Sequence, residues 1–136
     1  FSRPAEAPYL SVVTPGTHDM STIRGWWEED RNFTQKFYHS ELQGSGDAPL
    51  HCDPGISQAI VRQHLASPAM WSIFQLQDLL GMDGKLRRKD VDAERINVPG
   101  NPKNYWRYRM HLTLEELSQA ESFNSQIHER IRRNER

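Results

Sequence analysis

Near the N-terminus, a short apolar run leads through a tight turn to two adjacent polar residues and then to a helix. Residues 9–14 are rich in β-branched side chains and lie between two prolines, which is typical of a short strand. His18 and Asp19 follow a Pro-Gly turn, and helical spacing of apolar residues begins after Thr22. In α/β enzymes, the loops at the carboxyl ends of strands carry the reactive groups. The segment therefore predicts an α/β fold with His18 and Asp19 at the tip of a strand.

Asp19 and Ser21 also admit a purely structural role. Asp, Ser and Thr side chains cap helices by accepting hydrogen bonds from the first backbone N–H groups. Either residue would then serve only the helix that follows it. The pattern alone leaves both roles open.

A second apolar run, residues 69–76, has the composition of a strand that is covered on both faces. It ends just before Asp78, so a polar side chain again follows a strand, although capping of a helix or turn is an alternative role. Two helical segments separate the runs: residues 22–37, and a helix that Asp53 and Pro54 open. This alternation of strands and helices favours the α/β class.

The remaining segments are polar, and the last of them is helical in pattern. Residues 28–31 are expected to form a solvated face, and residues 85–95 a solvated loop or short helix, because both carry charges of both signs. Thr113 and Glu116 have the spacing of a capping box, which predicts one amphipathic helix to about residue 132. Its apolar stripe comprises Leu114, Leu117, Ala120, Ile127 and Ile131.

Several aromatic residues admit either a packing role or a role in binding sugar. Trp26 and Trp27 lie on the first predicted helix, where core packing is the favoured interpretation. Gly25 beside them indicates close packing against a neighbouring segment. Trp106 and Tyr108 are expected to be core or site wall.

The composition argues against several kinds of partner. The chain has 136 residues, 36% of them apolar, a mean hydropathy of −0.81 and a formal charge of −1. This charge argues against strong attraction to nucleic acid or to anionic membranes, and no apolar run approaches the ~20 residues of a membrane span. Cys52 is the only cysteine, and neither it nor His51 belongs to a pattern of paired metal ligands. We therefore expect no nucleic acid, no membrane and no metal, and a reducing compartment such as the cytoplasm.

The last predicted helix ends in a cluster of arginines that a nucleic acid could contact. The cluster comprises Arg130, Arg132, Arg133 and Arg136. Glu129 and Glu135 interleave with it, and cations near a helix C-terminus stabilise the helix dipole without any ligand. The dipole is the favoured explanation.

Three stretches together resemble the 4-α-glucanotransferases (amylomaltase or disproportionating enzyme, glycoside hydrolase family 77). They are Thr17-His18-Asp19 with Gly25-Trp26 shortly after, Leu76-Gln77-Asp78-Leu79-Leu80, and Asn97-Val98-Pro99-Gly100 with the Trp- and Arg-containing stretch that follows. The resemblance implies that residues 1–136 form a single incomplete domain, the C-terminal strand–helix units of a (β/α)8 TIM barrel. Such a piece would be mostly helical by residue count. The first residue is Phe and no signal peptide is visible, which also predicts an internal or C-terminal piece of a longer protein.

The same resemblance implies roles for individual residues. Asp19 would be the carboxylate that stabilises the transition state of a retaining glycosyl transfer. His18, Thr17, Asp78 and Asn97 would bind the sugar, whereas the nucleophile and the acid/base would lie on earlier strands outside this sequence. Asn104 receives no role, because the family's usual Asn-Trp is replaced here by Asn-Tyr-Trp.

The implied substrates are α-1,4-glucans, with maltose or maltodextrin as donor and no cofactor. The sequence of residues 25–30 and 67–71 looks most like the plant-type branch of this family, which uses maltose. A cut barrel exposes strand edges, so we expect the isolated fragment to be inactive, and to self-associate or rearrange toward a more helical form.

Two other functions fit the sequence. The long amphipathic final helix and the polar composition would suit a non-catalytic helical interaction module. The aromatic residues would suit a carbohydrate-binding module.

Overall fold

The computed structural model describes residues 1–134, which form a mostly helical chain with one small sheet. In chain order the elements are η1 (Pro4–Glu6), β1 (Val12–Val13), α1 (Ile23–Glu29), α2 (Arg31–Ser40), α3 (Pro54–Leu65), β2 (Trp71–Ser72), α4 (Leu76–Leu80), η2 (Asp92–Glu94), α5 (Leu114–Gln119) and α6 (Glu121–Arg133).

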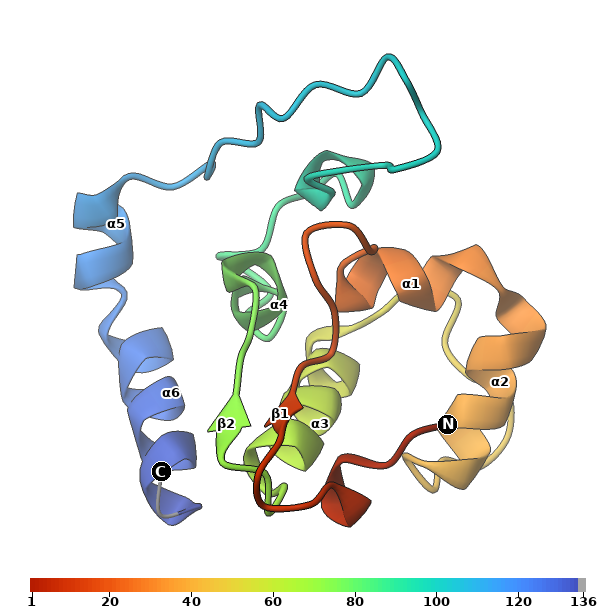
Figure 1. Ribbon diagram of the computed structural model, residues 1–136. Coiled ribbons are helices and arrows are strands. Elements are labelled where there is room, and N and C mark those ends of the chain that lie inside the picture. The colour runs from red at the N-terminus through yellow and green to blue at the C-terminus, as the bar shows by residue number, and fades with distance from the viewer. Residues whose placement is uncertain (135–136) are drawn as a thin grey trace.

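Strands β1 and β2 pair in parallel, with Val12 opposite Trp71 and Val13 opposite Ser72. Helices α1, α2 and α3 form the crossover between them, so the strand–helix alternation expected from the sequence is present. Because the strands are parallel, the loops that leave both carboxyl ends start on the same side of the sheet (Figure 1).

Both strands are shorter than residues 9–14 and 69–76, the ranges expected from the sequence. Among the described residues each strand pairs only with the other, over the two residue pairs given above. The expectation that the second strand is covered on both faces is also wrong here. Trp71 is 61% exposed and Val12 is 54% exposed, so apolar side chains of the sheet face outward.

The helix expected over residues 22–37 is two helices, broken at Asp30. Asp30 is extended (φ −137°, ψ 101°), and its carboxylate accepts a hydrogen bond from the Phe33 backbone N–H at 3.0 Å. The break therefore arises from a strong N-cap residue within an otherwise helical pattern. Residues 28–31 are not simply a solvated face, because Arg31 donates to the carbonyls of Ala48 and Pro49.

Helix α3 begins as the sequence predicts and supplies the centre of the core. Asp53 caps it by accepting from the Ile56 N–H at 2.9 Å, and Pro54 occupies the first turn. Trp27 is a core residue as expected: it is 1% exposed and its indole N–H donates to Pro49 O at 2.9 Å. The buried apolar cluster comprises Ile23, Trp27, Ala48, Cys52, Ile56, Ile60, Val61, Leu65, Leu80, Met82 and Phe123.

The single C-terminal helix expected from the sequence is divided at Ala120 (ψ 61°) into α5 and α6. The capping box of Thr113 and Glu116 is present. Leu114 is 72% exposed, so it does not belong to the apolar stripe, whereas Leu117, Ala120 and Ile127 pack against the core. Of the arginine cluster, Arg130 donates to Gln58 at 3.1 Å, and Arg136 lies outside the described residues.

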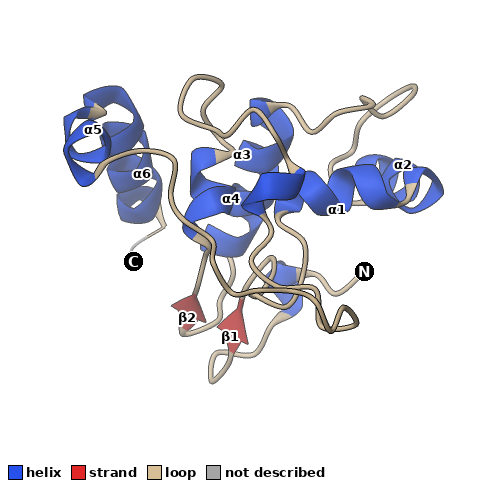
Figure 2. Ribbon diagram, turned by 90° about the horizontal axis from the view of Figure 1, so that it is seen from above, coloured by secondary structure: helices blue, strands red, loops and turns tan. Residues whose placement is uncertain are grey.

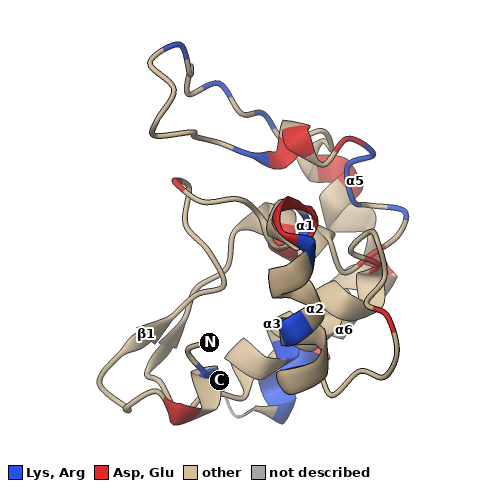
Figure 3. Ribbon diagram, turned by 90° about the vertical axis from the view of Figure 1, so that its right-hand side faces the viewer, with Lys and Arg blue, Asp and Glu red and all other residues tan. Residues whose placement is uncertain are grey.

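The helices form three groups in space. Helices α3 and α4 lie in the middle, α1 and α2 on one side, and α5 and α6 on the other, in both Figure 1 and Figure 2. A long irregular segment joins η2 to α5 and arches over the carboxyl ends of the strands (Figure 1). Several Lys and Arg residues mark that segment in Figure 3. Within residues 1–134, every helix is too short or too polar to cross a membrane.

Candidate functional site

The loop that leaves β1 carries Thr17, His18 and Asp19, and contacts at both ends hold it in place. Gln75, which follows β2, donates to Thr17 O at 3.2 Å. Gly16 lies so close to the end of the loop that a Cβ there would be 3.2 Å from Ser21 O. The three predicted site residues therefore lie where the two strands end.

Thr22 is the N-cap of the helix that follows this loop, because its Oγ1 accepts from the Gly25 N–H at 3.2 Å. The structure therefore excludes Asp19 and Ser21 as the cap of α1. The Asp19 side chain is 50% exposed and is available for another role.

Two asparagines from the distant segment 96–104 form a hydrogen-bonded series that ends at the Asp19 carboxylate. Asn97 Nδ2 donates to Asp19 Oδ1 at 2.7 Å, and Asn104 Nδ2 donates to Asn97 Oδ1 at 2.8 Å. Asn97 is 9% exposed, whereas the carboxylate faces solvent. A carboxylate only accepts hydrogen bonds, so these two hydrogen bonds fix which way both side-chain amides are oriented. Asn104 received no role from the sequence, because Asn-Tyr-Trp stands here in place of the family's usual Asn-Trp.

His18 lies near the same carboxylate oxygen. His18 Nε2 is 3.5 Å from Asp19 Oδ1, and its ring centroid is 5.0 Å from that of Trp106. Trp106 is 62% exposed, so it is a surface residue beside His18 and not a core residue. Thr17 Oγ1 accepts from the Asp19 backbone N–H at 3.4 Å, a long contact that orders the loop locally.

Asp78 occupies a different position from the other predicted site residues. It is 1% exposed, and its Oδ1 accepts from the Ile23 N–H at 2.7 Å, which satisfies the first amide of α1. Burial raises the pKa of the Asp78 carboxyl to about 6, and the negative charge of Glu94 adds to the rise. Asp78 thus caps a helix, as the structural alternative predicted, although it caps α1 and not a helix of its own segment.

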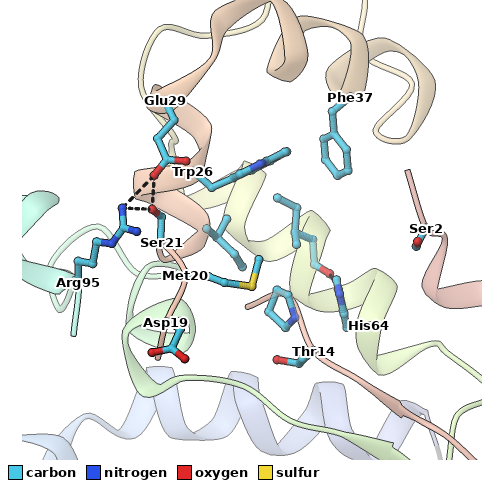
Figure 4. Close-up of a pocket in the computed structure, with 13 residues that line it drawn as sticks. Ser2, Thr14, Asp19, Met20, Ser21, Trp26, Glu29, Phe37, His64 and Arg95 are labelled. Atoms are coloured by element: carbon cyan, nitrogen blue, oxygen red, sulfur yellow. Dashed lines mark hydrogen bonds and ion pairs between the residues drawn. The ribbon is translucent and has the colours of Figure 1, made fainter. Parts of the chain in front are cut away.

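A cavity of about 430 Å³ adjoins Asp19, between the loop after β1, α1 and α3 (Figure 4). Its lining combines charged, hydroxyl and apolar groups: Ser2, Thr14, Pro15, Asp19, Met20, Ser21, Ile23, Trp26, Glu29, Phe37, Ile60, His64 and Arg95. Trp26, expected in the core, is half-buried and lines this cavity. Asp78 is absent from the lining.

Neutral hydroxyl-rich ligands suit this site better than metal ions. Residues 1–134 contain no group of three His, Cys, Asp or Glu side chains that could hold a metal. His51 pairs with Glu28 at 3.0 Å, and the buried Cys52 thiol lies 3.4 Å from Ser57 Oγ. A carboxylate accepts hydrogen bonds from hydroxyls, and a neutral imidazole can both donate and accept. The exposed Trp106 ring beside His18 adds an aromatic surface to these polar groups.

A family model described as 4-alpha-glucanotransferase matches residues 1–114 of the chain. The 4-alpha-glucanotransferase DPE2 of rice (Oryza sativa subsp. japonica) is 40% identical over 131 residues, covering 96% of this chain and 14% of the rice protein. The 4-alpha-glucanotransferase of Chlamydia pneumoniae is 33% identical over 123 residues, covering 87% of this chain and 22% of the relative. The chain therefore spans less than a quarter of either relative.

The fold is similar to part of a solved enzyme structure. Amylomaltase from Streptococcus agalactiae, solved in complex with acarbose, superposes with a TM-score of 0.58 at 24% identity. The match covers 86% of this chain and 21% of that protein.

Proposed function

The chain belongs to the 4-alpha-glucanotransferase family, and from this premise we propose that it forms part of an enzyme that transfers glucosyl units between α-1,4-glucans. The transfer proceeds with retention of configuration, through a covalent glycosyl intermediate. The observation that carries the proposal is the half-exposed Asp19 carboxylate, held by Asn97 beside a cavity.

Asp19 stabilises the transition state in this proposal. As the transferred ring becomes oxocarbenium-like, its hydroxyls donate more strongly to a carboxylate, so the bonds to Asp19 strengthen and the barrier falls. A carboxylate already oriented by the Asn97 amide needs little rearrangement when that charge develops.

The neighbours of Asp19 bind the sugar. His18 offers one donor and one acceptor to a hydroxyl pair, and Thr17 and Asn97 complete the polar surface of the loop. Asp78 was also assigned to sugar binding by resemblance. Its burial and its bond to the Ile23 N–H favour an indirect role, in which it holds the start of α1 beneath the loop.

The two other carboxyl groups of the reaction come from sequence outside this chain. A retaining enzyme needs a nucleophile and an acid/base about 5–5.5 Å apart. Glu29 lines the cavity but is bonded to Ser21 and Arg95, so it does not supply a free reactive carboxyl. We propose that the chain supplies the C-terminal strand–helix units of a (β/α)8 barrel, which the fold match to amylomaltase supports, and that the enzyme is cytoplasmic. Alone, the chain would be inactive and would self-associate through its exposed strands.

Maltose and longer maltodextrins are the proposed donors. The 40% identity to rice DPE2 and the sequence of residues 25–30 support the plant-type branch. The acarbose bound to the similar amylomaltase supports an α-glucan-like ligand. No cofactor takes part in the proposed reaction.

Chain-length analysis tests the proposal. The full-length polypeptide that carries this sequence is incubated with maltose plus a glycogen acceptor, and separately with maltotriose. We expect glucose release that matches the glucosyl units gained by the acceptor, with no net rise in reducing ends. Hydrolysis without transfer, or no reaction with either donor, would contradict the assignment.

A further inference from the structure

Arg95 joins α1, the end of the Asp19 loop and the segment that carries Asn97. Its Nη1 donates to Ser21 Oγ at 2.8 Å and to Glu29 Oε1 at 3.3 Å, as Figure 4 shows. Its Nε donates to Asn97 O at 3.0 Å. Ser21 Oγ in turn donates to Glu29 Oε1, so the side chains of Arg95, Ser21 and Glu29 are all hydrogen-bonded to one another.

Glu94, the residue before Arg95, anchors the same segment in the protein interior. Glu94 forms a buried ion pair with Arg24, and their side chains are 3% and 7% exposed. The other Glu94 oxygen accepts from Thr22 Oγ1 at 3.1 Å, and Gln77 Nε2 donates to Glu94 O at 3.1 Å. The sequence predicted a solvated loop or short helix over residues 85–95, but Glu94 in this segment is buried. The buried pair fixes the chain direction immediately before Arg95.

Asn97, two residues after Arg95 in this fixed segment, contacts Asp19. Arg95 holds the main-chain carbonyl of Asn97, while the Asn97 side chain donates to Asp19 Oδ1 at 2.7 Å. We propose that Arg95 is a positioning residue for the reaction: it places the Asn97 amide, and thereby sets the direction of the Asp19 carboxylate. The inference rests on the proposed role of Asp19 in glucosyl transfer.

A direct contact between Arg95 and sugar is the competing role. Arg95 lines the cavity, and its side chain is 34% exposed. However, three hydrogen bonds within the protein already engage its Nη1 and Nε groups. A direct contact would contribute to ground-state binding and would raise KM when lost, whereas a positioning role lowers kcat.

The test is a double-mutant cycle in the full-length polypeptide, with kcat and KM measured for glucosyl transfer. We expect Arg95→Ala to lower kcat by about 10- to 100-fold with KM changed less than about threefold, because small misplacement of a reacting group costs that much. We expect Arg95→Ala/Asn97→Ala to be no slower than Asn97→Ala, because Arg95 acts through Asn97. The paired control is Glu129→Gln/Arg133→Ala, which removes an exposed Arg–Glu pair on α6 and should leave kcat and KM unchanged.

Arg95→Lys keeps the positive charge and serves if Arg95→Ala does not fold. A lysine lacks the planar fork that reaches Ser21, Glu29 and Asn97 together, so kcat should again fall with little change in KM. Multiplying effects of the Arg95 and Asn97 changes, or a raised KM at normal kcat, would overturn the inference. Failure of the proposed function is recognised separately, as absence of glucosyl transfer by the unmutated full-length polypeptide. Transfer that survives Asp19→Asn would overturn the role of Asp19 on which the inference rests.

Discussion

Asn97 Nδ2 lies 2.7 Å from Asp19 Oδ1, so an amide and a carboxylate 78 positions apart in the sequence form one hydrogen-bonded unit. Hydrogen bonds to a charged acceptor are stronger than neutral ones, and they fix direction as well as distance. The half-exposed carboxylate still faces the cavity, where a ligand can reach it. The proposed chemistry depends on this unit.

Asn104 stabilises that unit, because its Nδ2 donates a hydrogen bond of 2.8 Å to Asn97 Oδ1. We expect Asn104→Ala to lower kcat of the full-length polypeptide by about fivefold, since one neutral hydrogen bond contributes roughly 1 kcal/mol. Steady-state kinetics measures the change. Lys103→Ala, an exposed change in the same segment, is the control and should have no effect on kcat. An unchanged kcat in Asn104→Ala would separate Asn104 from the site.

Asp78 gives stability a defined pH dependence. The folded state holds its proton up to a pKa of about 6, whereas the unfolded state releases it near 3.8. The folded state thus binds more protons between these values, and the free energy of unfolding falls as pH rises through this window, by about 3 kcal/mol from this residue. Burial raises the pKa of Glu94 as well, so part of the slope has a second source.

Asp78→Asn isolates the Asp78 contribution. The asparagine Oδ1 can still accept from the Ile23 N–H, but it does not titrate. Urea unfolding of the full-length polypeptide from pH 4 to 7 should therefore show a shallower slope in Asp78→Asn than in the wild type. Asp47→Asn, an exposed loop change, should keep the wild-type slope. Identical slopes in Asp78→Asn and wild type would refute the assignment.

Asp30 separates α1 from α2 and caps the second helix. We expect Asp30→Ala to lower the free energy of unfolding by about 1 kcal/mol, because the Phe33 N–H loses its acceptor. Asp30→Ser retains an acceptor and should lose much less. Chemical unfolding followed by circular dichroism compares the two variants, and equal losses would show that capping is not the cause.

The order of strands and helices could be predicted from the sequence, whereas the helix breaks could not. The β-branched run, the Asp53–Pro54 start and the Thr113–Glu116 box are local patterns, and each appears in the structure. The break at Asp30 interrupts a continuous helical pattern. Arg31, at the start of α2, donates to the distant carbonyls of residues 48 and 49, and such contacts have no local pattern.

The same distinction applies to the site. His18 and Asp19 follow a strand directly, so the sequence indicated their place. The contact of Asn97 with Asp19, the approach of Trp106 to His18 and the link through Arg95 depend on a long irregular segment folding back over the strands. Asp78 resembled a site residue by pattern. Its burial depends on α1 packing across it, which no local pattern shows.

The most direct test of the account is the turnover of Asp19→Asn in the full-length polypeptide. Asparagine keeps the size of the side chain and removes the negative charge that the developing sugar cation requires. We predict that kcat for glucosyl transfer falls by at least about 100-fold while KM changes only a few-fold, as expected when stabilisation specific to the transition state is lost. A folded Asp19→Asn variant that transfers glucosyl units at the wild-type rate would contradict the central claim.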